Sequence, residues 1–237
     1  MGPAGCGKSY QIIKVLQFLN ETKINAYVLD LEDKLEAMFL GTGGIPPNTT
    51  LWNAIFWEDI KAAESQIGAV VKPNEWIIVD RIDLSWPSAQ RWFTQKKWEE
   101  SLADHMLAKS IKMGKKETML TPRFDQGAWQ VINEMYESFI LNLLYKYKAN
   151  LLFTTGIKPP DTDSPLDATW NVNVLPRGQK EIPHQPHSVF LLGMMKDTRN
   201  NRTWNITTAK DLPGREYFEK EELLDFSIQY LSTHYKP

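Results

Sequence analysis

The chain has 237 residues, of which 42% are hydrophobic and 24% are charged, and its formal net charge is −2. This length and composition predict one globular domain over residues 1–237, and the near-neutral charge excludes a basic field over the whole molecule. A single cysteine, Cys6, excludes an intrachain disulfide and suits a reducing compartment. Because no signal-like segment and no apolar run of about 18 residues occurs, we expect a cytoplasmic protein that does not enter a membrane.

The first motif is GPAGCGKS, a complete G-x-x-x-x-G-K-[ST] pattern from Gly2 to Ser9. Its glycines let the backbone turn tightly and aim N–H groups at phosphate oxygens, and the helix that follows points its positive end at the anion. Lys8 is expected to reach the β- and γ-phosphates, and the Ser9 hydroxyl to bind Mg²⁺. The predicted nucleotide-binding residues are Gly2, Pro3, Ala4, Gly5, Cys6, Gly7, Lys8, Ser9 and Tyr10. The alternative, a glycine turn before a helix, does not account for Lys-Ser in register.

The phosphate loop begins directly after Met1, although such a loop ordinarily follows a buried β-strand. We expect either that the natural chain starts further upstream or that the sheet lacks the strand that anchors the loop. In the second case Gly2 would lie on a fraying terminus, which would weaken binding at the loop.

Downstream of the loop, apolar segments of strand type alternate with segments of helical periodicity. The predicted strands are 26–31, 51–57, 76–80 and 150–155, and the predicted helices are 58–67 and 129–147. This alternation predicts an α/β fold of three layers, in which a mostly parallel sheet is covered by helices on both faces. Between the third and fourth strands, residues at about 85–128 predict a helical and partly basic excursion.

Three features follow the fourth strand. Residues 158–186 contain several Pro and Asp residues without periodicity, which is typical of a long functional loop. Residues 188–195 and 202–209 are joined by a polar turn and predict an antiparallel β-hairpin. Residues 219–234 predict a C-terminal helix.

A carboxylate ends the third predicted strand. In the sequence WIIVD, four apolar residues bury the strand and leave Asp80 at its carboxyl end. Paired with the phosphate loop upstream, Asp80 is expected to hold Mg²⁺ through water, beside the Ser9 hydroxyl. The alternative is an ordinary aspartate at a strand end.

Hydrolysis of the terminal phosphate of a nucleotide also requires a group that activates or orients water. In AAA+ proteins a Glu directly follows the metal-binding Asp, whereas this chain has Arg81 there. The sequence LDLE at 29–32 instead resembles the strand-end motif of RecA-like recombinases, and this resemblance implies that Glu32 is the catalytic base. The alternative is that Glu32, Asp33 and Glu36 form the acidic start of a helix.

The order of the remaining segments also resembles the RecA-like core. The resemblance implies that Thr154 or Thr155, at the tip of the fourth strand, senses the γ-phosphate. It further implies that Lys210, or less strongly Arg215, reaches the nucleotide of a neighbouring subunit after the hairpin, which would require a homo-oligomer. Together with Lys8, such a cation stabilises the charge that develops on the transferred phosphoryl group. The alternative for Lys210 is a surface lysine in a turn.

The layout resembles, over nearly its whole length, the short RecA-like, phage-type nucleotide-binding ATPases of recombination and single-strand DNA metabolism. The resemblance implies Mg²⁺-dependent binding and hydrolysis of ATP, coupled to single-stranded DNA. Two rivals remain open. A nucleotide kinase shares the loop but needs lid arginines, of which no cluster stands out, and a non-hydrolysing scaffold uses bound nucleotide only to set its assembly state.

Two regions are candidates for contact with nucleic acid. Residues 106–123 carry five cations against one acid; the cations are Lys109, Lys112, Lys115, Lys116 and Arg123. Nearby aromatic residues are candidates for stacking on bases, although this spacing also fits a hydrophobic core; they are Trp86, Trp92, Phe93 and Trp98. In residues 158–186 the acids balance the bases, so charge alone does not favour DNA there.

Overall fold

The computed structural model describes residues 1–112, 124–160, 170–178, 186–196, 198, 201–212, 218–219, 221–222 and 225–235. Two sequence predictions fall outside the described residues. The first is Arg215, and the second is the cluster of cations in 109–123, of which only the backbone of 109–112 is described. Most of the 158–186 loop is likewise outside them.

The centre of the molecule is a four-stranded sheet in which every strand pair is parallel. In spatial order the strands are β2 (Thr49–Asn53), β1 (Ala26–Asp30), β3 (Trp76–Asp80) and β4 (Asn150–Phe153). All residues of β1 and β3 are buried, as expected for parallel strands covered on both faces. In the register of this pair, Asp30 lies opposite Asp80, so two carboxylates meet at the carboxyl edge of the sheet.

The second predicted strand was placed too far along the chain. β2 ends at Asn53, and Trp57, predicted as its last residue, instead begins α3 (Trp57–Val70) and is buried in the core. The apolar run at 51–57 therefore spans the end of a strand and the start of a helix. Periodicity over so short a run does not separate the two.

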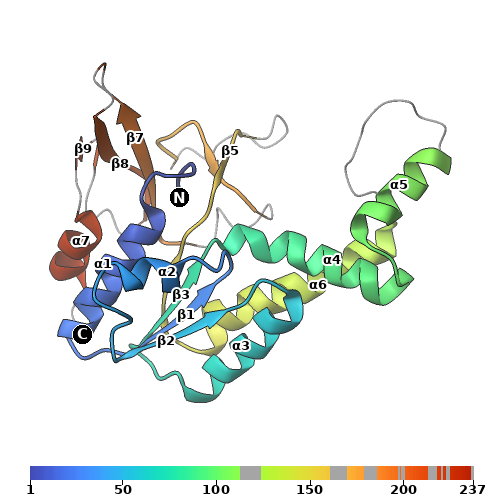
Figure 1. The fold of residues 1–237 in the computed structure, drawn as a ribbon, viewed down its shortest axis with the longest axis horizontal. Coiled ribbons are helices and arrows are strands. Elements are labelled where there is room, and N and C mark those ends of the chain that lie inside the picture. Colours follow the sequence, from blue (N-terminus) through green and yellow to red (C-terminus); the bar gives the residue numbers. More distant parts are fainter. Residues whose placement is uncertain are drawn as a thin grey trace.

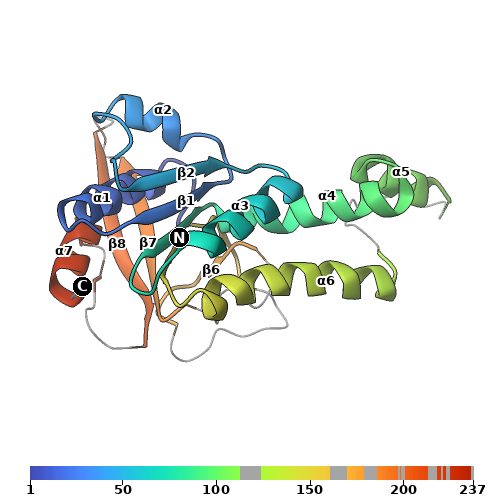
Figure 2. The same ribbon diagram turned by 90° about the horizontal axis from the view of Figure 1, so that it is seen from below.

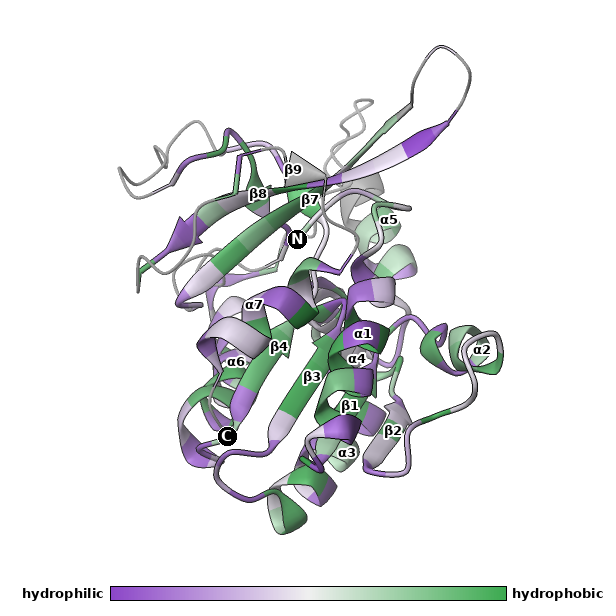
Figure 3. Ribbon diagram, turned by 90° about the vertical axis from the view of Figure 1, so that its left-hand side faces the viewer, coloured by the Kyte–Doolittle hydropathy of each residue, from purple (hydrophilic) through white to green (hydrophobic). Residues whose placement is uncertain are grey.

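Helices cover both faces of the sheet. On one face, α3 and α6 (Gln126–Leu141) pack against alternate residues of β1 and β3, and on the other face α1 (Lys8–Glu21) packs against the residues between them. Two shorter helices complete the second layer, α2 (Leu35–Leu40) and α7 (Phe226–His234). Figure 3 shows the apolar strands β3 and β4 lying among these helices. The predicted three-layer α/β architecture is confirmed.

The region predicted as an excursion is a helical arm. It consists of α4 (Ser85–Trp98), α5 (Leu102–Lys112) and the start of α6, and it extends away from the sheet with α4 and α6 side by side (Figures 1 and 2). Its aromatic side chains pack on one another. Trp86 lies parallel to Trp129 with ring centroids 6.1 Å apart, and Trp98 stacks on His105 at 4.0 Å. The core interpretation of these tryptophans holds, and the base-stacking hypothesis has no support in this packing.

A second, antiparallel sheet lies beside the carboxyl end of the central one. The predicted hairpin is confirmed as β7 (Ser188–Lys196) and β8 (Arg202–Asp211), with β9 (Glu221–Glu222) added to β8. Short strands β5 (Ile157–Lys158) and β6 (Leu175–Pro176) form a separate pair. The backbone of the first two residues joins the sheets, since Gly2 N–H donates to Thr155 O at 3.2 Å and Leu192 N–H donates to Met1 O at 2.8 Å.

Two predicted helices have different bounds in the structure. The helix predicted at 129–147 divides into α6 and the π-helical turn η2 (Asn142–Lys146). Its start is fixed by Asp125, whose carboxylate accepts the N–H of Ala128 at 2.8 Å and caps the first turn. The C-terminal helix predicted at 219–234 begins only at Phe226, because residues 221–222 pair with β8. No helix in the described ranges is long and apolar enough to cross a membrane.

Replacing Gly68 by Ala is expected to destabilise the protein by about 1–3 kcal/mol, because this glycine touches Tyr147. An added Cβ would lie 2.4 Å from a carbon of the Tyr147 ring. The ring is held in place by a hydrogen bond from its hydroxyl to the buried carboxylate of Glu64. Thermal unfolding followed by circular dichroism measures the effect, and Gly41→Ala, whose Cβ would meet its nearest atom at 3.6 Å, is the control. Equal melting temperatures for the two variants would contradict this packing.

Candidate nucleotide site

The phosphate loop has the backbone that its glycines predict. Gly7 has φ +91°, a left-handed conformation that side chains rarely adopt, and α1 begins at the next residue, Lys8. At Gly2 the constraint is space, because an added Cβ would lie 2.4 Å from Cys6 Sγ and 2.5 Å from Leu192 O. The loop is therefore curled against the hairpin, with its N–H groups at the amino end of α1.

Lys8 is folded back on this loop. Its Nζ donates to the carbonyl oxygens of Gly2 at 2.9 Å and Pro3 at 2.8 Å, and the residue is 9% exposed. A nucleotide phosphate, as an anion, is a stronger partner for the same group.

Three predicted site residues, Ser9, Asp80 and Thr154, are joined by hydrogen bonds next to the phosphate loop. Ser9 Oγ donates to Asp80 Oδ2 at 2.8 Å, and Thr154 Oγ1 donates to Asp80 Oδ1. Asp80 is fully buried, and desolvation raises the pKa of its carboxyl against the opposing effect of these two hydrogen bonds. The phosphate loop, the third strand and the fourth strand thus converge on one carboxylate.

The pair Ser9 and Asp80 fits Mg²⁺. Both groups offer oxygen, the ligand that Mg²⁺ prefers, and Ser9 Oγ lies 2.8 Å from Asp80 Oδ2. Burial disfavours the charged carboxylate when no cation is near, and a divalent cation reverses that penalty. The described residues contain no cluster of three or more His, Cys, Asp or Glu side chains suited to another metal.

Glu32 lies in the turn after β1, at the same edge of the sheet. The turn is held by Asp30, a fully buried residue whose carboxylate accepts the N–H groups of Glu32 at 3.0 Å, Lys34 at 2.7 Å and Leu35 at 2.6 Å. The carboxylate of Glu32 is partly exposed and pairs with Arg81 through Oε1 and with Lys34 through Oε2. α2 begins only at Leu35, so Glu32 precedes the helix rather than lying in its first turn.

Arg81, the residue after Asp80, links the two strand ends. Its Nε lies 2.9 Å from Asp83 Oδ1 and its Nη2 lies 3.0 Å from Asp83 Oδ2, while Nη1 pairs with Glu32. The hydrogen bonds to Asp83 are the main cause of the raised pKa of the Arg81 guanidinium. Sequence reasoning noted Arg81 only as a departure from the AAA+ pattern.

The other predicted site residues lie around this centre. Thr155 Oγ1 donates to the carbonyl of Arg177 at 2.7 Å. Of the two sensor candidates, Thr154 is the one that bonds to Asp80. Lys210 lies in β8 opposite Val189 and is 7% exposed, within the hairpin rather than after it.

One further side chain near the loop was not expected. An indole carbon of Trp204, from β8, lies 3.6 Å from the position that a Cβ on Gly7 would take. Nothing in the sequence marks Trp204, because its contact with the loop depends on how the hairpin folds back over α1.

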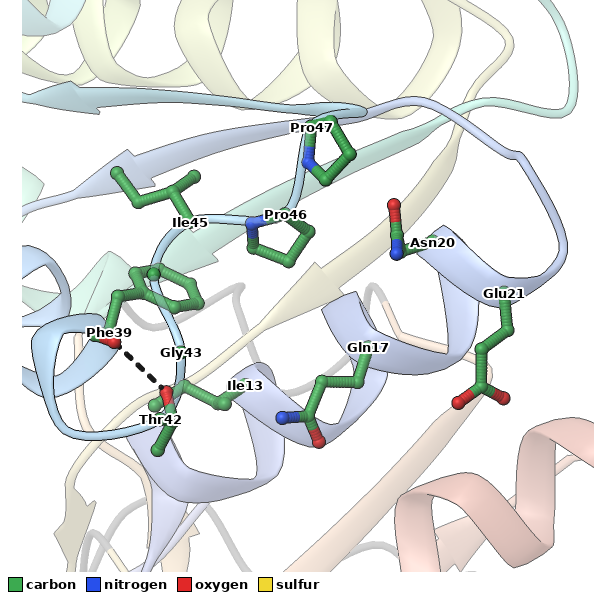
Figure 4. A pocket seen from close by; sticks show the side chains of 11 residues that line it. Ile13, Gln17, Asn20, Glu21, Phe39, Thr42, Gly43, Ile45, Pro46 and Pro47 are labelled. Atoms are coloured by element: carbon green, nitrogen blue, oxygen red, sulfur yellow. Dashed lines mark hydrogen bonds between the residues drawn. The ribbon is translucent and has the colours of Figure 1, made fainter.

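A groove of about 360 Å³ lies elsewhere on the molecule. As Figure 4 shows, it is bounded by α1, including Ile13 and Gln17, and by the segment from Phe39 to Pro47. None of the predicted phosphate-contacting residues lines it. The groove is thus separate from the site built around Asp80.

Comparison with known proteins supports the fold. No family model matches the chain, and no curated protein matches it. Among solved structures, a KaiC-like protein from the hyperthermophilic archaeon Pyrococcus horikoshii OT3 is similar, with a TM-score of 0.52 and 12% identity over 94% of this chain and 84% of that one. The chain has a RecA-like fold. At this identity the likeness concerns architecture alone, so the activity must be argued from the site.

Proposed function

We propose that this protein binds MgATP and hydrolyses it to ADP and phosphate. The observation that carries the proposal is the convergence of Ser9, Asp80 and Thr154 at the phosphate loop, with Glu32 on the adjoining strand end. Phosphoryl transfer to water requires oxygen ligands for a metal ion, a cation that binds the phosphates and a carboxylate that accepts a proton from water. The RecA-like fold supports the same reaction class by analogy.

In the proposed reaction, the site residues have distinct roles. Lys8 leaves the loop carbonyls to pair with the phosphates, Ser9 and Asp80 hold Mg²⁺, and Thr154 fixes Asp80 and reports the γ-phosphate. Glu32 accepts the proton of the attacking water. The bound metal supplies charge neutralisation on the phosphate oxygens.

We further propose that single-stranded DNA is the effector and that the active form is a homo-oligomer. The support is positional: Arg177 is exposed, and its backbone is bonded to Thr155 and Gly156 directly after the sensor threonine. DNA bound at Arg177 would therefore be linked to Thr154, the proposed γ-phosphate sensor, through Thr155 and Gly156. In the oligomer, Lys210 or Arg215 is the proposed cation for the neighbouring nucleotide.

Wild type and Lys8→Ala are compared for MgATP binding and phosphate release, each with and without oligo(dT). We expect lysine-dependent turnover that rises with DNA, and a loss of about 100-fold or more in Lys8→Ala. Turnover that requires Lys8 but does not respond to DNA would contradict the proposal that DNA is the effector and would support the ATPase proposal. Tight MgATP binding without phosphate release would favour the scaffold, and phosphate transfer to an added nucleotide would favour the kinase.

A further inference from the structure

The backbone at the tip of β3 adopts an unusual conformation. Arg81 has φ +64°, in the left-handed region that long side chains rarely enter. Its N–H donates to Thr154 Oγ1 at 2.9 Å, beside the bond that Thr154 makes to Asp80. Strained backbone of this kind persists where the surroundings fix it, and it concentrates at functional sites.

The side chain of Arg81 is fixed from one side. Asp83 binds it through two parallel contacts of 2.9 and 3.0 Å, and the Asp83 side chain is only 1% exposed. Asp83 Oδ1 also accepts the N–H of Gly156 at 3.3 Å, which ties it to the end of β4. These two contacts fix the plane of the guanidinium and therefore the direction of its third nitrogen, Nη1.

That remaining nitrogen, Nη1, faces Glu32 Oε1. Among the described residues, the second carboxylate oxygen, Oε2, forms an ion pair with Lys34 Nζ at 3.1 Å, and the Lys34 side chain is 62% exposed. The two contacts of Glu32 are therefore unequal. One is made by an anchored and partly buried cation, and the other by a solvent-exposed lysine.

We propose that Arg81, held by Asp83, is the positioning residue of Glu32: it holds Oε1 and leaves Oε2 to accept the proton of the attacking water. This inference rests on the proposed function, because it presupposes that Glu32 is the base. Arg81 touches neither nucleotide nor water in this role. It acts by fixing the direction of the Glu32 carboxylate, whereas Asp30 holds the backbone of the turn.

The test uses the double variant Arg81→Asn/Asp83→Asn. Asn tolerates the left-handed backbone, and changing both residues leaves no buried carboxylate without its cation. We expect kcat to fall by about 10- to 100-fold while the KM for MgATP stays within about threefold. Lys34→Gln, which removes the other cation on Glu32, is the matched control and should change kcat by less than about twofold.

Several kinetic results would overturn the inference. A higher kcat in the double variant would mean that the contact between Arg81 and Glu32 inhibits the reaction. If the double substitution lowers kcat by the same factor in a Glu32→Gln background as in the wild type, Arg81 does not act through Glu32. Rescue of kcat by Arg81→Lys would also contradict it, since an ammonium cannot replace the two-point grip.

Hydrogen exchange keeps this test separate from the test of the ATPase. Amides of Lys34 and Leu35 in the wild type and the double variant are compared at the same pH, with unfolding monitored in parallel. Faster exchange of these amides without global destabilisation supports the positioning role of Arg81 even if the wild type proves not to hydrolyse ATP. Unchanged exchange together with unchanged kcat overturns it.

Discussion

Replacing Glu32 by Gln is expected to lower kcat for ATP hydrolysis by about 10²- to 10⁴-fold while MgATP affinity stays within about threefold. Gln keeps an oxygen that can accept a hydrogen bond from Arg81, so the turn after β1 should keep its geometry. What it loses is the capacity to take a proton from water. Steady-state phosphate release and equilibrium binding, measured on the same preparations, separate the two effects.

The matched control is Glu36→Gln, an exposed acid four residues further on, in the first turn of α2. It makes the same chemical change near the same edge of the sheet and should leave kcat within about twofold. Equal activity of Glu32→Gln and wild type would exclude Glu32 as the base. Glu32 would then be only the ion-pair partner of Arg81 and Lys34 in the turn before α2.

Replacing Asp80 by Asn is expected to abolish Mg²⁺-dependent hydrolysis, with a loss of at least about 100-fold, and to stabilise the nucleotide-free protein. Burial raises the pKa of the Asp80 carboxyl, which means that the folded protein without a cation disfavours its charged form. A neutral amide can still bond to Ser9 and Thr154 and carries no such penalty. If about 1 kcal/mol is recovered, the melting temperature rises by about 2–4 °C.

The effect of Asp80→Asn on stability is measured by thermal unfolding at neutral pH with and without Mg²⁺. We expect Mg²⁺ to raise the melting temperature of the wild type and not that of Asp80→Asn. Asp59→Asn, an exposed acid in the first turn of α3, controls for the general loss of one negative charge. A fall in melting temperature for Asp80→Asn in the absence of Mg²⁺ would contradict the account of its burial.

The sequence predicted the parts of the site that lie on regular elements. The phosphate loop, the WIIVD strand and the hairpin carry strong local patterns, and the structure confirms the elements at nearly the predicted bounds. Glu32 was expected from the resemblance to RecA-like recombinases, and it lies near Asp80 because parallel strands end at a common edge of the sheet. The tryptophans were harder to interpret, because spacing on a helix does not reveal which surface faces a partner helix.

The residues that sequence reasoning missed act through contacts across the sheet edge. Asp30 lies two residues before the proposed base, and it holds the turn by accepting three N–H groups. Arg81 and Asp83 look like solvated charges after a strand, and only the left-handed backbone at Arg81 brings its guanidinium back toward Glu32. A backbone conformation of this kind at a non-glycine residue leaves no signal in the residue types.

Single-turnover hydrolysis, with protein in excess over γ-labelled ATP and Mg²⁺ present, tests the central claim most directly. Under these conditions product release does not limit the signal, and no phosphate acceptor other than water is present. We predict full conversion to ADP and free phosphate by the wild type and intact bound ATP with Glu32→Gln. Recovery of intact ATP from the wild type, or equal phosphate release by both proteins, would contradict a site in which Glu32 activates water beside Asp80.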